Sequence, residues 1–362
     1  MTENSQDPDE IFQKLAEGSP RFMQSYLAHE APQTVAAILL LQPPARAAEV
    51  LNGLPSDIRH RAIHCMTISR PMLAPAKAAL ARTLAAEFPL AVPATVPIED
   101  VQKIVELMHP DLRDDARLAL RGPIAAEEPQ ASDDQTAAAP SRTPSVPPAP
   151  VGDPNDKFER WPLLEVVYDR FVRRTATSLR RLTGENLEVS LHSITSLYFA
   201  NYLSTIPLPV MLGAFKVRQW PGSGMLAAEP AVVETMVAAL LGGRNHVPAR
   251  TVEDRRPFTM IERDLFGLVA STMLDGLSKA FDVVGPVTFD FERVETNPRF
   301  AAIAPPMSAA ILARLDIAME DGGGRFELLL PYESLTPVRE LLLQTIQPPV
   351  RVKALPGQEQ VA

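Results

Sequence analysis

A chain of 362 residues, 46% of them hydrophobic, is long enough for two domains with separate cores. Its formal net charge of -9 argues against nucleic acid as the main partner, and its single cysteine, Cys65, excludes an intrachain disulfide and favours a reducing compartment. No apolar run approaches the roughly 20 residues of a membrane span, and the polar, acidic N-terminus does not resemble a signal peptide, so we expect a cytoplasmic protein.

Short helices that begin at prolines fill residues 1–121. Asp7 can cap a helix that starts at Pro8, and a second helix start follows at Pro20. The helix after Pro32 has an apolar face at helical spacing, which consists of Val35, Ile38, Leu39 and Leu41. Short helices joined in series by proline turns predict an all-α helical solenoid.

His60 and His64 are four residues apart, so both lie on one face of a predicted helix. Two histidines at this spacing are typical of a metal site. Cys65, however, points about 100° away from His64, and no fourth ligand is evident. We therefore expect solvent-facing histidines, a small buried thiol, and neither a metal nor another cofactor.

One motif of this helical module resembles a known family. Glu30-Ala31-Pro32-Gln33, followed by a run of aliphatic residues, resembles the Glu-His-Pro-Gln helix of the middle, armadillo-like domain of the flagellar motor switch protein FliG. Ala31 stands where that family has histidine. The similarity covers residues 22–88. It implies that Glu30, Pro32 and Gln33 belong to a partner-binding surface.

Residues 122–157 differ in composition from the module before them. The segment is rich in Pro, Ala and Ser and contains no aromatic residue. It can bury too little apolar surface to offset the entropy that ordering would cost. We therefore expect a disordered linker of roughly 35 residues, with an r.m.s. span on the order of 30 Å.

Residues 158–347 contain the same order of elements twice: helix, strand, insertion, hairpin and helix. The closing helix of the first copy ends at Gly242. The second copy opens with a capping box formed by Thr259 and Glu262 and closes with a helix over residues 334–343. Two such copies predict a pseudo-twofold α/β domain with a shared antiparallel sheet.

Four segments of this domain resemble a second family: residues 202–209, 242–245, 294–304 and 330–335. They are similar to the middle domain of the flagellar motor switch protein FliM, and the similarity covers residues 158–343. The resemblance implies a CheC-like fold. It leaves residues 348–362 as a tail, without the C-terminal FliN-like domain of that family and therefore without direct high-affinity binding to FliN.

The glycine pair at the end of the first copy fits two interpretations. Gly242 can take the left-handed backbone that ends a helix, so the loop fits a surface connector between the half-domains. In the FliM family this loop reads Gly-Gly-x-Gly and contacts the Glu-His-Pro-Gln helix of FliG. The resemblance therefore implies a partner-binding loop formed by Gly242, Gly243, Arg244 and Asn245, with Asn245 at the fourth position.

Together the two resemblances imply a structural and regulatory subunit of the flagellar rotor switch, or C-ring, acting in rotation, direction switching and chemotaxis. They imply a location at the inner membrane, which the chain reaches only through the basal body. FliG and neighbouring switch-ring subunits are the implied partners. Residues 5–11 loosely resemble the FliM peptide that binds phosphorylated CheY, and they fit a plain helix start as well.

An enzyme of the same fold is the alternative, because the domain also resembles CheC-type phosphatases of response regulators. Those enzymes carry a Glu-x-x-Asn pair on a long helix, and its amide orients the attacking water. The corresponding positions here are Glu165 with Tyr168 and Glu262 with Leu265. Because neither helix carries the asparagine, we expect no phosphatase activity.

Both parts of the family contact lie on this one polypeptide. We predict that the Glu30–Gln33 helix and the glycine loop dock on each other, within one molecule or between ring neighbours. Gln33 is expected to bond loop backbone while Pro32 packs flat, and the linker gives an effective concentration near millimolar. The alternative is that Ala31 and Asn245 mark a lost contact, which leaves the helical module to bind elsewhere.

Overall fold

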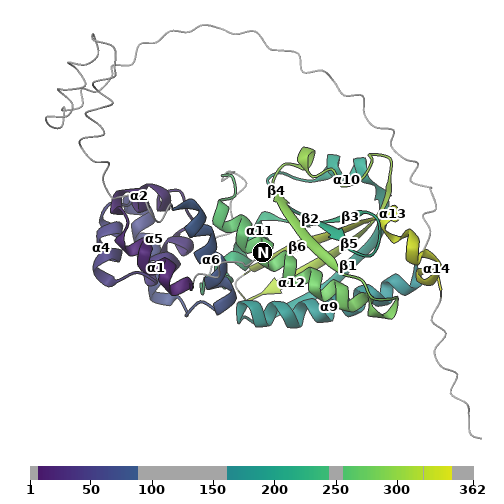
Figure 1. Cartoon of the computed structure of the whole chain (residues 1–362), viewed down its shortest axis with the longest axis horizontal. Helices are drawn as coiled ribbons and strands as arrows, with labels where there is room; N and C mark the ends of the chain where they lie inside the picture. The colour runs from purple at the N-terminus through teal and green to yellow at the C-terminus, as the bar shows by residue number, and fades with distance from the viewer. Residues whose placement is uncertain (1–6, 89–160, 244–255, 321, 345–362) are drawn as a thin grey trace, which may run out of the picture.

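The computed structural model describes residues 7–88, 161–243, 256–320 and 322–344. Within these ranges a helical module and an α/β domain lie side by side (Figure 1). The predicted linker, the predicted tail, Arg244 and Asn245 lie outside the described residues, as do the first residues of the loose CheY-peptide similarity. The domain boundaries therefore remain predictions.

Six described helices form the N-terminal module, and five of them carry proline in the first turn. They are α1 (Pro8–Glu17), α2 (Pro20–Leu27), α3 (Pro32–Leu40), α4 (Pro44–Asn52), α5 (Ser56–Ile68) and α6 (Ala74–Glu87). Proline is favourable there because the first turn has no use for its missing amide hydrogen. Helix α3 is the centre of the module, since every residue from Gln33 to Leu39 is buried. The predicted all-α module is confirmed.

The C-terminal domain is built on a six-stranded sheet with the order β1-β5-β6-β3-β2-β4, and all its pairings are antiparallel. Its strands are β1 (Leu187–Tyr198), β2 (Met211–Val217), β3 (Ser223–Ala228), β4 (Phe289–Glu295), β5 (Ala309–Met319) and β6 (Gly322–Pro331). The order reads symmetrically from the central β6–β3 pair outward. Each outer strand belongs to one half of the sequence and pairs with a hairpin of the other half, so the predicted pseudo-twofold domain is confirmed.

Helices cover both faces of the sheet (Figure 1). The long helices α9 (Pro162–Thr183) and α12 (Met260–Ala280) lie on one face, and the short α10 (Phe199–Thr205) covers a separate apolar cluster on the other. Helix α11 (Pro230–Leu240) leads toward the helical module. The apolar cluster under α9 and α12 continues into that module without interruption. This continuity places the two parts of the chain against each other.

The closing helix predicted for residues 334–343 is not continuous. It is divided into α13 (Tyr332–Leu335), a 3-10 turn (Thr336–Val338) and α14 (Arg339–Leu342). Pro337 accounts for the break, because proline donates no backbone hydrogen bond and its ring collides with the preceding helical turn. None of the described helices is long and apolar enough to cross a membrane.

Candidate docking site between the helical module and the α/β domain

The Gln33 side chain joins the two parts of the chain. Its amide nitrogen Nε2 lies 3.3 Å from the carbonyl oxygen of Leu241 and 3.1 Å from Ser69 Oγ, so its two hydrogens have two acceptors. Ser69 Oγ donates in turn to the carbonyl oxygen of Cys65 at 2.7 Å. Gln33 is buried. Its amide therefore satisfies a loop carbonyl that water does not reach.

The two glycines allow the backbones to approach closely. Gly242 ends α11 in the left-handed conformation, with φ of 78°, and its carbonyl oxygen accepts the Arg70 amide hydrogen at 2.7 Å. A Cβ atom on Gly242 would lie 2.1 Å from the Arg70 carbonyl oxygen, and one on Gly243 would lie 2.8 Å from Gln33 Cδ. A side chain at Gly242 would therefore collide with the backbone of the helical module, and one at Gly243 would displace the Gln33 amide.

Of the seven residues predicted from sequence, the structure brings Gln33, Gly242 and Gly243 together. Glu30 lies nearby, against the start of α12. Pro32 begins α3 and is half-buried, so its predicted flat packing on the loop remains a prediction. Arg244 and Asn245 are outside the described residues. Their role as binding residues likewise remains a prediction.

Sequence reasoning missed the polar contacts that flank the glycine loop. Arg70 forms an ion pair with Glu185, just beyond the end of α9. On the other side, Thr83 Oγ1 of α6 donates to Asp264 Oδ2 of α12 at 2.7 Å. These are ordinary polar residues on helix surfaces or in turns, without a motif or a period of their own. Only the three-dimensional arrangement, with α6 beside α12, identifies them (Figure 1).

The Glu30 carboxyl lies at the predicted capping box of α12, which the structure confirms. Thr259 Oγ1 accepts the Glu262 amide hydrogen at 3.2 Å, and Glu262 Oε2 accepts that of Thr259 at 2.9 Å. Burial raises the pKa of Glu30 from 4.5 to about 7. A hydrogen bond from Thr259 and the charge of Arg256 lower this pKa, while the charge of Glu262 raises it. The interface thus contains a carboxyl group whose pKa lies near neutral pH.

The residues at the phosphatase-like positions are structural. Glu262 is 2% exposed, closes the capping box and pairs with Arg256 at 2.5 Å. Tyr168 is fully buried in α9, and burial raises the pKa of its hydroxyl. Among the described residues, no group of His, Cys, Asp and Glu is arranged to hold a metal.

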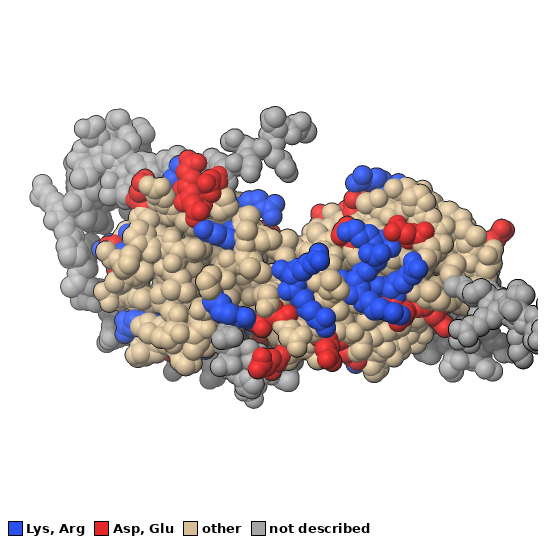
Figure 2. Space-filling model, turned by 90° about the horizontal axis from the view of Figure 1, so that it is seen from below, with Lys and Arg blue, Asp and Glu red and all other residues tan. Residues whose placement is uncertain are grey.

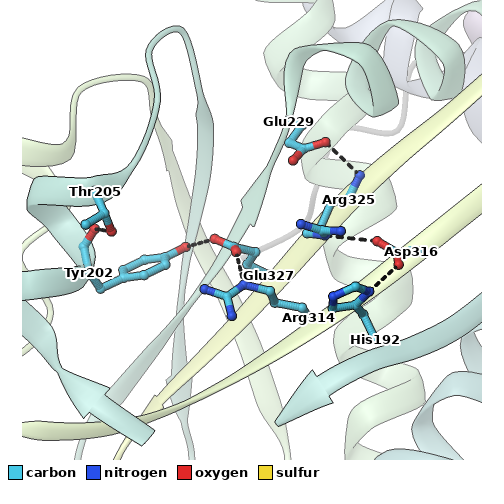
Figure 3. Close-up of polar contacts among 8 residues, drawn as sticks. All are labelled: His192, Tyr202, Thr205, Glu229, Arg314, Asp316, Arg325 and Glu327. Carbon is cyan, nitrogen blue, oxygen red and sulfur yellow. Dashed lines mark hydrogen bonds and ion pairs between the residues drawn. The ribbon is translucent and has the colours of Figure 1, made fainter. Parts of the chain in front are cut away.

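The opposite face of the sheet carries a chain of paired charges (Figure 3). Glu327 accepts hydrogen bonds from Tyr202 Oη at 2.9 Å and from Arg314 Nε at 2.8 Å. Asp316 pairs in the same way with Arg325 Nε and His192 Nδ1, both at 2.9 Å. Because both carboxylates have cationic partners, this network is a structural feature of the sheet.

Exposed arginines occupy the outer side of α9: Arg170, Arg173, Arg174 and Arg181. Figure 2 views the molecule from the side of α9 and α12, and basic side chains gather there with acidic ones among them. Arg173, for example, pairs with Asp169 one turn away. The face is therefore mixed in charge and does not form the uniform basic patch that nucleic-acid binding requires.

Comparisons with known proteins match both parts of the chain. The family model of the flagellar motor switch protein FliM matches residues 157–347, more than half of the chain, and that of the FliG middle domain matches residues 20–90. FliM of Caulobacter vibrioides strain NA1000 is 49% identical over 187 residues, which are 52% of this chain and 50% of that protein. FliM of Pseudomonas aeruginosa is 25% identical over 183 residues, 51% of this chain and 56% of that protein.

Among solved structures, the FliM middle domain of Vibrio alginolyticus aligns with 50% of this chain and 99% of its own, at 28% identity and a TM-score of 0.45. The chain spans about half the length of the curated relatives it matches. The matched half is the α/β domain, and the helical module carries the similarity to FliG.

Proposed function

The chain belongs to the flagellar motor switch protein FliM family, and from this premise we propose that it is a structural subunit of the motor switch, without enzymatic activity of its own. The observation that carries the proposal is the contact between the FliG-like helix α3 and the glycine loop of the FliM-like domain. In this chain the two surfaces meet through Gln33, Leu241 and the Arg70–Gly242 backbone bond. Protein–protein contact is therefore its proposed activity.

The proposed partner-binding surface consists of Glu30, Pro32, Gln33, Gly242, Gly243, Arg244 and Asn245. FliG and neighbouring switch-ring subunits are its proposed partners. Because the helical module lies on the glycine loop, a separate FliG-like helix that needs the same loop must displace it. The module then acts as a built-in competitor, and ring assembly depends on which helix occupies the loop. Phosphorylated CheY remains a further proposed partner, through residues 5–11.

The proposed location is the cytoplasmic side of the inner membrane, at the flagellar base. The test is a fluorescent fusion of the full chain, expressed from its own locus, with labelled hooks as position markers. We expect foci at hook-bearing poles or sites and altered rotational switching in a deletion strain. A fusion that complements the deletion but stays diffuse would refute the proposal.

A binding assay with purified proteins tests whether the helical module competes with FliG for the glycine loop. Gln33→Ala removes the amide that bonds Leu241, and Gln13→Ala on the exposed side of α1 is the matched control. If self-docking limits access to the loop, purified Gln33→Ala protein should capture a FliG middle domain more strongly than Gln13→Ala or wild type. Equal capture by all three proteins would contradict the competition.

A further inference from the structure

Glu30 combines burial with an unsatisfied oxygen at the docking site. The residue is 7% exposed, and its Oε2 atom has no hydrogen-bond partner among the described residues. The Thr259 side chain hydrogen-bonds the carboxyl. Since Thr259 Oγ1 already accepts the Glu262 amide hydrogen, its own hydrogen is available to donate to Glu30. The Oε2 atom of the carboxyl is thus buried without a partner among the described residues.

The charged groups from the domain that face Glu30 are Glu262 and Arg256. Glu262 repels an ionised Glu30, whereas Arg256 attracts it. Arg256, however, donates two hydrogen bonds to Glu262, at 2.5 and 3.3 Å. Its positive charge is therefore shared between two carboxyl groups, and it does not fully compensate a buried carboxylate at Glu30.

Tyr26 of α2 faces Glu30 from within the helical module. Its hydroxyl oxygen is buried and has no hydrogen-bond partner among the described residues. Burial and the negative charges of Glu30, Glu87 and Asp264 raise its pKa, so it stays neutral and adds no positive charge. The surroundings from α2, α6 and α12 thus contain more acidic than basic groups.

Burying a carboxylate without full compensation costs free energy, and the neutral acid avoids this cost. When the helical module leaves the domain, Glu30 loses its contact with Thr259 and the α12 start and regains water. Ionisation of Glu30 then carries no cost from burial. The two protonation states of this one side chain therefore prefer different arrangements of the chain.

We propose that the helical module docks on the α/β domain with uptake of a proton by Glu30, so that the neutral carboxyl favours the docked chain and the carboxylate favours its release. The inference rests on the docking contact of the proposed function and adds its regulation. A rise in pH then exposes the glycine loop, and a fall covers it.

The direction and size of the pH effect on docking follow from the pKa of Glu30, which burial raises from 4.5 to about 7 in the docked chain. Because the docked value is the higher one, the stability that the neutral acid gives to docking is fully present below pH 4.5 and is lost as the pH rises through 7. These two values predict that the docking equilibrium constant falls about tenfold from pH 6 to pH 8 and changes little above.

The Arg70 amide provides the readout in the full-length chain. Its hydrogen bond to the Gly242 carbonyl oxygen crosses the interface, so its exchange with deuterated water reports opening of the docked state. The protection factor is the intrinsic exchange rate at each pH divided by the measured rate. A β3 amide in the central sheet serves as the reference. We expect the Arg70 protection factor to fall about tenfold from pH 6 to pH 8, while the β3 amide stays constant.

Two variants identify the responsible group. Glu30→Gln keeps the shape and the contact with Thr259 but cannot ionise, so its Arg70 protection should be independent of pH and higher than wild type at pH 8. Glu17→Gln, on the exposed side of α1, is the matched control and should follow wild type. His29→Gln is a second control, because His29 precedes Glu30 in the chain and its Nδ1 atom contacts the Ser25 carbonyl oxygen, and it too should follow wild type.

Each other outcome overturns the inference. A wild-type Arg70 amide that is protected equally at both pH values refutes the proton linkage and leaves docking intact. An amide unprotected at both values, with β3 protected, refutes docking and the linkage together. A tenfold fall that persists in Glu30→Gln assigns the pH dependence to another group. If Glu30→Gln fails to fold, a wild-type Arg70 protection factor that does not fall from pH 6 to pH 8 still refutes the inference.

Discussion

Glu327 and Glu30 lie in two regions of the molecule, and their carboxyl groups differ in how completely they are hydrogen-bonded. On the far face of the sheet, Glu327 accepts hydrogen bonds from Arg314 and Tyr202. At the docking site, Glu30 is more deeply buried and has an oxygen without a partner among the described residues. Full pairing fixes one charge state and one arrangement. Incomplete pairing leaves two states close in free energy, so the docking site, unlike the sheet face, is suited to regulation.

The largest effect is expected from Gly242→Val, which tests whether the docking site is rigid at its backbone contact. A β-branched side chain is strained at φ of 78°, and its Cβ would lie 2.1 Å from the Arg70 carbonyl oxygen. We expect loss of Arg70 amide protection by more than about a hundredfold, since strain and collision together exceed roughly 3 kcal/mol. Gly18→Ala, where the added Cβ meets only ordinary contact, is the control. Retained protection in Gly242→Val would show that the loop does not depend on glycine.

Gln33→Ala should weaken docking less than Gly242→Val. It leaves the Leu241 carbonyl oxygen buried without its amide partner, at a cost of about 1–3 kcal/mol. This corresponds to roughly a fivefold to hundredfold fall in Arg70 protection, measured at pH 6. The β3 amide should keep its protection, because Gln33 hydrogen-bonds Ser69 and the end of α11 and not a strand of the sheet. Equal loss at both amides would mean that the substitution unfolds the domain.

Glu327→Gln tests the other side of the comparison. It replaces a paired carboxylate on the sheet, and because Arg314 and Glu327 are both partly exposed, the expected loss is only about 1 kcal/mol of domain stability. Urea unfolding followed by circular dichroism measures it. Arg70 protection and its pH dependence should not change. Glu340→Gln on exposed α14 is the matched control, and a shifted pH profile in Glu327→Gln would remove the distinction between the two regions.

The smallest expected effect is none, for Glu165→Ala in a phosphatase assay. Glu165 is exposed on α9, but the residue three positions later is the fully buried Tyr168 instead of an amide. The purified protein should not shorten the lifetime of an acyl-phosphorylated response regulator, measured by radiolabel decay. Accelerated decay that disappears on Glu165→Ala would establish an enzyme.

Local sequence signals predicted the architecture well, because they reflect physical requirements of single elements. Prolines at helix starts, the Thr259–Glu262 capping box and the repeated order of elements each fix local geometry, and the structure contains them. The closing helix was predicted as continuous, although Pro337 divides it. Proline cannot continue a helix, so Pro337 is a signal for this break that is already present in the sequence.

The candidate site was less accessible to sequence reasoning. Gln33 and the two glycines were found through a motif, whereas Thr83 with Asp264, and Arg70 with Glu185, became partners only when two distant segments met. The altered pKa of Glu30 also could not be read from its neighbours in sequence. It arises from burial against α12, more than 200 positions along the chain.

Because the outer strands of the α/β domain pair with the other half of the sequence, part of its sheet cannot form until late in translation. Strand β1 pairs with β5, and the nearest partners, Tyr198 and Ala309, are 111 positions apart (309 minus 198). At about 5–20 residues per second, β1 waits roughly 6 to 22 s after translation for the strand that completes it. Helix α9, already made, can cover its apolar side during this interval. The helical module is synthesised before both β1 and β5. A nascent chain therefore contains the complete helical module before the α/β domain that it docks on is complete.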